Sequence, residues 1–77
     1  MARVDPEPVL EDFEELLEKL DELMEQDPES LAFYDSIKEK AGDMIKWIEQ
    51  NNVATDGHER AVRNWKELVE EKMDNLS

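Results

Sequence analysis

The sequence predicts an all-α protein, an antiparallel three-helix bundle that forms a single domain. Apolar residues recur at intervals of three and four positions along three successive segments, which is the period of an amphipathic helix. Only short connections separate these segments, and helices joined by short connections pack against each other as hairpins. A chain of 77 residues is also the size of one small domain.

The first helix is expected over residues 6–26, after a loose arm at residues 1–5. Asp5 offers a side-chain acceptor to the free N–H groups of the first turn, and Pro6 is well tolerated at the first helical position. The apolar line then has spacings of 3, 4, 3 and 4, and it consists of Leu10, Phe13, Leu17, Leu20 and Met24.

The second helix is expected over residues 28–51, where the helical period is longest. Asp27 and Pro28 repeat the start signal, and Asn51 or Asn52 can end the helix because Asn tolerates a left-handed conformation. Its apolar line consists of Tyr34, Ile37, Ala41, Met44 and Ile48, widened by Phe33, Ile45 and Trp47. This wide face predicts a central helix with a neighbour on each side.

The third helix is expected over residues 56–74. Asp56 and Glu59 fit a capping box, with Thr55 as a competing N-cap. The short connection before this helix should bring Trp47 and Trp65 side by side in the core or at its edge.

The composition excludes several classes of protein. There is no cysteine, and the single histidine, His58, excludes most nitrogen-ligated metal clusters. No apolar run approaches the roughly 20 residues that span a bilayer, and the N-terminus lacks the apolar stretch of a signal peptide. We therefore expect a soluble, cytoplasmic protein without a cofactor or a metal.

No motif in the chain supports catalysis. There is no Gly-rich phosphate loop, no Ser/His/Asp arrangement and no cysteine nucleophile. The many carboxylates fall on predicted exposed faces, where nothing shifts their pKa into a catalytic range. His58 lies in a first helical turn and is best interpreted as a surface histidine without a chemical role. We expect a binding protein and not an enzyme.

Acidic residues are concentrated on the first helix. The chain has a net charge of −13, and residues 6–26 contribute −8 of it, nine acids against one lysine. The other two helices contribute −2 each, five acids against three lysines and six acids against four basic residues. Such a charge argues against direct binding to nucleic acid or to an anionic membrane.

Two interpretations of this acidic face remain open. It can be a solvated face that keeps a small protein soluble. It can also be a docking surface for a basic partner, such as a nucleic-acid-binding protein to which the carboxylates stand in for phosphates. The docking surface is the leading hypothesis, and its candidate residues are Glu11, Glu14, Glu15, Glu18, Asp21, Glu22 and Glu25.

The alternative hypothesis belongs to another class of function. The apolar face of the first helix is wider than one neighbour requires, and surplus apolar surface at its edges favours self-association. The chain would then be a structural module that forms a homo-oligomer, and its acids would only keep it soluble.

Overall fold

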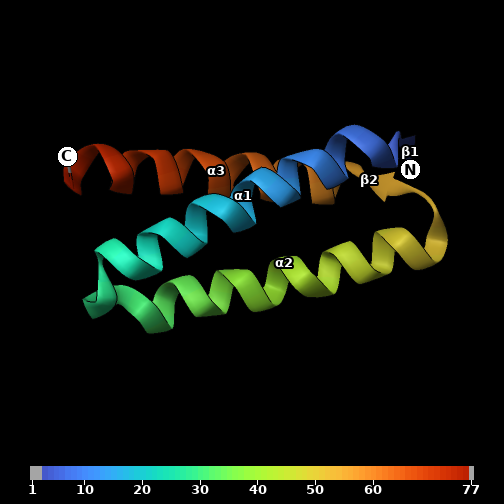
Figure 1. Ribbon diagram of the computed structural model, residues 1–77. Helices are drawn as coiled ribbons and strands as arrows, with labels where there is room; N and C mark the ends of the chain where they lie inside the picture. Colours follow the sequence, from blue (N-terminus) through green and yellow to red (C-terminus); the bar gives the residue numbers. More distant parts are fainter. Residues whose placement is uncertain (1–2, 77) are drawn as a thin grey trace.

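A computed structural model describes residues 3–76 and shows a three-helix bundle, as the sequence predicts. The helices are α1 (Pro6–Gln26), α2 (Leu31–Asn51) and α3 (Asp56–Leu76). Helix α2 runs antiparallel to both α1 and α3, which therefore start at the same end of the molecule (Figure 1). The bundle is elongated, with extents of 38 × 19 × 16 Å.

The helix that packs against both others is α1, and not the second helix as predicted. Helix α1 contacts α2 and α3 extensively, whereas α2 and α3 make few contacts with each other. The physical reason is the width of the buried face. Helix α1 buries five residues, compared with four in α2 and two in α3. The buried residues of α1 are Val9, Phe13, Leu16, Leu20 and Leu23.

The two tryptophans do not pair in the core. Trp65 of α3 is half-buried against Phe13 of α1, with ring centroids 6.5 Å apart. Trp47 of α2 is 42% exposed and contacts the ring of His58 instead. The expectation that they lie side by side is wrong, because α3 turns Trp65 toward α1 and not toward α2.

The expectation of a loose arm over residues 1–5 is wrong at residues 3 and 4. Arg3–Val4 form a short strand, β1, which pairs antiparallel with β2 (Ala54–Thr55). The segments that precede α1 and α3 lie at the same end of the bundle, so their backbones can pair (Figure 1). Residues 1 and 2 of the arm lie outside the described residues.

The helix ends follow the sequence signals in part. The Asp5 side chain caps α1 by accepting from the Glu7 N–H, and Asn52 ends α2 in the left-handed conformation at φ 55°. Asp27 does not cap the second helix, because its carboxylate accepts from the Tyr34 hydroxyl at 2.8 Å. Pro28–Ser30 form a 3-10 turn, η1, so α2 begins at Leu31.

Candidate functional site

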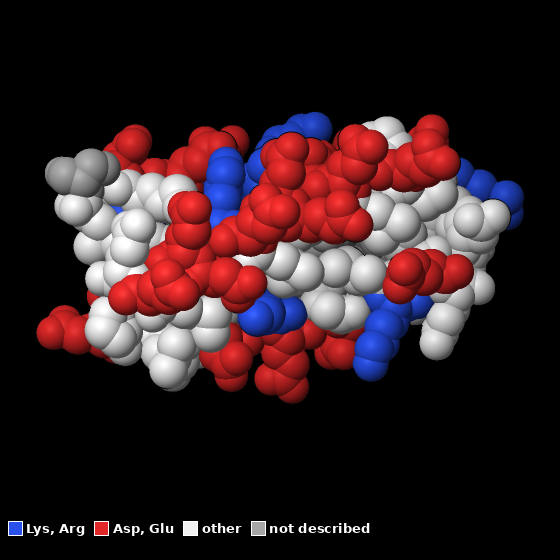
Figure 2. Space-filling view, viewed as in Figure 1, with Lys and Arg blue, Asp and Glu red and all other residues white. Residues whose placement is uncertain are grey.

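Five carboxylates form a line along the solvent side of α1. They recur at intervals of 3, 4, 4 and 3, which is one face of a helix, and all are exposed. At 1.5 Å per residue the line is about 20 Å long. Acidic side chains form a band across the face of the molecule that α1 crosses, with uncharged residues on both sides of the band (Figure 2). We name this line the acidic crest, and it consists of Glu11, Glu14, Glu18, Glu22 and Glu25.

The other two predicted site residues lie beside the crest and are engaged within the fold. The Glu15 Oε2 atom is 2.9 Å from Lys66 Nζ of α3, which also lies 3.2 Å from Asp12 Oδ1. On the opposite side, Asp21 Oδ1 is 2.9 Å from Lys38 Nζ of α2. The sequence did not separate these two acids from the crest, because their lysine partners are 51 and 17 positions away.

The electrostatics of Glu15 follow from its lysine partner. The hydrogen bond from Lys66, together with its charge, lowers the pKa of the Glu15 carboxyl. The same hydrogen bond raises the pKa of Lys66, although partial burial of the ammonium acts in the opposite direction. Both groups are therefore charged at neutral pH, and they tie α1 to α3.

The crest carboxylates lack such partners in the part of the chain that the structure describes. No lysine or arginine nitrogen of residues 3–76 lies within 4 Å of them. Glu14, Glu18 and Glu22 stand four residues apart on the helix, where like charges repel by about 0.2–0.5 kcal/mol per pair in an isolated helix. The lysines of α2 and α3 thus neutralise carboxylates at the edges of α1, but they do not neutralise the negative charge of its crest.

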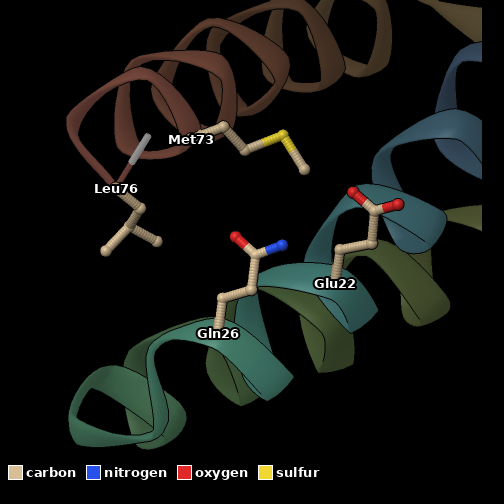
Figure 3. A pocket seen from close by; sticks show the side chains of 4 residues that line it. All are labelled: Glu22, Gln26, Met73 and Leu76. Atoms are coloured by element: carbon tan, nitrogen blue, oxygen red, sulfur yellow. The ribbon is translucent and has the colours of Figure 1, made fainter.

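An open hollow of about 610 Å³ lies at the C-terminal end of the crest. Glu22 and Gln26 project into it from α1, and Met73 and Leu76 from α3 (Figure 3). Met73 and Leu76 therefore form an apolar wall beside the crest carboxylate of Glu22. Sequence patterns did not predict the hollow, because it depends on how the last turns of α1 and α3 are placed relative to each other.

Across residues 3–76, no group of three His, Asp or Glu side chains is placed to hold a metal ion. Over the same residues, no helix has both the length and the apolar character required to cross a membrane.

A comparison of the chain with protein families, curated proteins and solved structures finds no match.

Proposed function

We propose that this protein is a small acidic binding protein whose α1 helix presents the acidic crest to a basic surface of a protein partner. It acts by association and carries no catalytic group. The observation that supports the proposal is a division among the α1 acids. Asp12, Glu15 and Asp21 at the edges are paired with lysines of the neighbouring helices, whereas no crest carboxylate is paired with a lysine or arginine within residues 3–76.

This division is not expected of a face that serves the fold alone. A helix selected only for stability gains from basic residues placed four positions from glutamates, as with Arg63 and Glu59 of α3. The crest instead repeats glutamate at this spacing. Unbalanced charge of one sign speeds the encounter with a surface of the opposite sign and fixes the register of docking.

The charge density of the crest suits a partner that binds nucleic acid. Five carboxylates over about 20 Å give roughly one charge per 5 Å, compared with about one per 3.4 Å along a single DNA strand. A row of lysines or arginines that binds phosphates can therefore bind the crest. The apolar wall of Met73 and Leu76 would contact the aliphatic part of a neighbouring partner side chain.

The experiment is capture of partners from the protein's own host on three immobilised forms. These are the wild type, a crest variant and a charge-matched control. The crest variant is Glu11→Lys with Glu18→Lys. The control is Asp43→Lys with Glu67→Lys, which makes the same change in net charge at exposed residues of α2 and α3.

The proposal predicts a basic protein that the wild type and the control retain and the crest variant loses. Duplex DNA added in solution should displace that protein, because the phosphates and the crest compete for the same surface. Equal capture by all three forms would contradict the proposal. Loss of capture by both variants would show that only net charge matters, and would contradict it as well.

The alternative function, a self-associating structural module, has one observation in its favour. Leu31, Phe33, Trp47 and Leu76 are exposed by 42–47% although they are large and apolar. If these residues mediate assembly, sedimentation at micromolar concentration should show a species heavier than the 9.1 kDa chain. A monomer throughout that range would exclude the structural module and leave the acidic crest as the binding surface.

A further inference from the structure

His58 occupies a reciprocal hydrogen-bonded turn at the start of α3. The Thr55 N–H donates to His58 Nδ1 at 3.2 Å, and the His58 N–H donates to Thr55 Oγ1 at 3.3 Å. This is the arrangement of a capping box, in which the residue three positions into the helix reaches back to the N-cap. An imidazole takes the place that Glu or Gln usually has. The predicted pair of Asp56 and Glu59 does not form the box.

The geometry assigns the protonation state of the ring. A backbone N–H can only donate, so Nδ1 must accept and carries no proton. The imidazole is therefore neutral, with its proton on Nε2. The Thr55 hydroxyl also lies 3.2 Å from Nδ1 and can donate to it as well.

The same ring joins three parts of the fold. Thr55 belongs to β2, whose partner strand β1 contributes Arg3 opposite Thr55. The other side of the imidazole meets the Trp47 ring of α2, with ring centroids 5.0 Å apart. Helices α2 and α3 have few other contacts, so this cluster is a main connection between them.

We propose that His58 is a pH-dependent latch that holds the start of α3 and the β1–β2 pair against α2 when neutral and releases them when protonated. Protonation turns Nδ1 into a donor, so the Thr55 N–H loses its acceptor. It also puts a positive charge in the first turn of α3, where the helix dipole is unfavourable to cations.

The charged groups around the ring do not form a stable pair with the protonated form. Asp56 and Glu59 flank it on α3, Arg3 lies on β1, Asp5 precedes α1, and α2 presents the uncharged Trp47. Within residues 3–76, no carboxylate oxygen is within 4 Å of a His58 ring nitrogen. Burial, meanwhile, lowers the pKa of His58 below its ordinary value of 6.5.

The sign of the pH effect follows from this lowered pKa. Between the folded pKa and 6.5 the unfolded chain binds more protons than the folded chain, so stability falls as the pH falls through that window. Above pH 6.5 the neutral His58 ring contributes its full stabilisation of the fold. This stabilisation should be lost progressively as the pH falls below 6.5.

The matched variant is His58→Gln, because Gln at this position keeps the backward hydrogen bond of a capping box and does not titrate. Unfolding by urea should be measured for both proteins between pH 7.5 and 5. As the pH falls, the free energy of unfolding of the wild type should fall relative to that of the variant. Both proteins have the same carboxylates, so the effect of carboxylate titration cancels in this comparison. The proposal would be overturned if the free energies of unfolding of the two proteins changed with pH by the same amount.

A titration of the wild type by nuclear magnetic resonance tests the same proposal without relying on a variant that folds. The ring should show the Nε2–H tautomer and a pKa below 6.5, and the Thr55 amide should shift with the same midpoint. An Nδ1–H tautomer, a pKa at or above 6.5, or an unresponsive Thr55 amide would each overturn the proposal.

Discussion

Tyr34 carries a hydroxyl to the edge of the buried core, and Asp27 accepts its hydrogen bond at 2.8 Å. This contact joins α2 to the residue that follows α1, and it explains why Asp27 is not an N-cap. Burial of the phenol raises the pKa of Tyr34, and the hydrogen bond to Asp27 acts in the same direction. The Tyr34 hydroxyl thus adds a side-chain hydrogen bond to a connection that backbone hydrogen bonds from Asp27 and Ser30 also hold.

Tyr34→Phe removes this hydroxyl and leaves the ring in the core. We expect the free energy of unfolding to fall by about 1–2 kcal/mol, since the bond is made to a charged acceptor. Because the folded pKa of Tyr34 is raised, the wild type loses stability as the pH rises above 10, and the difference between the two proteins should narrow there. Urea unfolding at pH 7 and at pH 10.5 measures both effects, and equal stability at pH 7 would contradict the account.

At the scale of the elements, the helices themselves follow from local sequence. The apolar period of α1 and the caps at Asp5 and Asn52 depend on neighbouring residues, so the sequence predicts them. The pairing of β1 with β2 depends on residues about 50 positions apart. The choice between Thr55 and Asp56 as the cap of α3 depends on where the His58 ring packs. The β1–β2 pair and the cap of α3 therefore could not be predicted from the sequence alone.

Helix α2 contains a glycine that its packing does not require. Nothing lies within 4 Å of a Cβ added at Gly42, and the residue is in the middle of the helix. Gly42→Ala should therefore raise the free energy of unfolding by about 0.5–1 kcal/mol, because Gly loses more backbone entropy on folding than Ala.

Gly57→Ala is the control for this substitution. Its Cβ would lie 3.4 Å from Thr55 Oγ1, the atom that caps α3, so we expect a smaller gain. Thermal unfolding followed by circular dichroism compares the two variants. A loss of stability in Gly42→Ala would show that the middle of α2 is packed more tightly than the structure indicates.

The tie between α1 and α3 can be tested through Glu15. Lys66→Met keeps the apolar stem of the side chain and removes its charge, so the pKa of the Glu15 carboxyl should rise. Because the wild-type pKa is lowered, the pair stabilises the fold at neutral pH, and this contribution is lost as the pH falls through that lowered pKa. Carboxyl titration by nuclear magnetic resonance measures the shift. An unchanged Glu15 pKa would mean that Lys66 does not hold this carboxylate in solution.

At the scale of the whole molecule, charge is segregated. Lysines of α2 and α3 face the edges of α1, and unmatched carboxylates face the solvent. The sequence predicted the acidic helix because the composition of residues 6–26 alone shows it. It could not divide those acids into crest and edge, because Lys66 and Lys38 reach them through tertiary packing. Of the seven candidates, five form the crest, and Glu15 and Asp21 do not.

The repulsion along the crest should be visible in the free protein. The Debye length falls from about 10 Å at 0.1 M ionic strength to about 3 Å at 1 M, so added salt increasingly screens carboxylates that stand one helical turn apart. Raising the salt concentration should therefore raise the melting temperature. The crest variant should respond less, since each of its new lysines stands beside acids three and four positions away.

The central claim is that the crest is kept for binding and not for the fold. Its most direct test measures stability and partner binding on the same sample of Glu11→Lys with Glu18→Lys. We predict a protein more stable than the wild type by about 1 kcal/mol at low salt that no longer binds the partner the wild type captures. A variant that is more stable and still binds that partner would contradict the claim, because the crest would then serve only to solvate the helix.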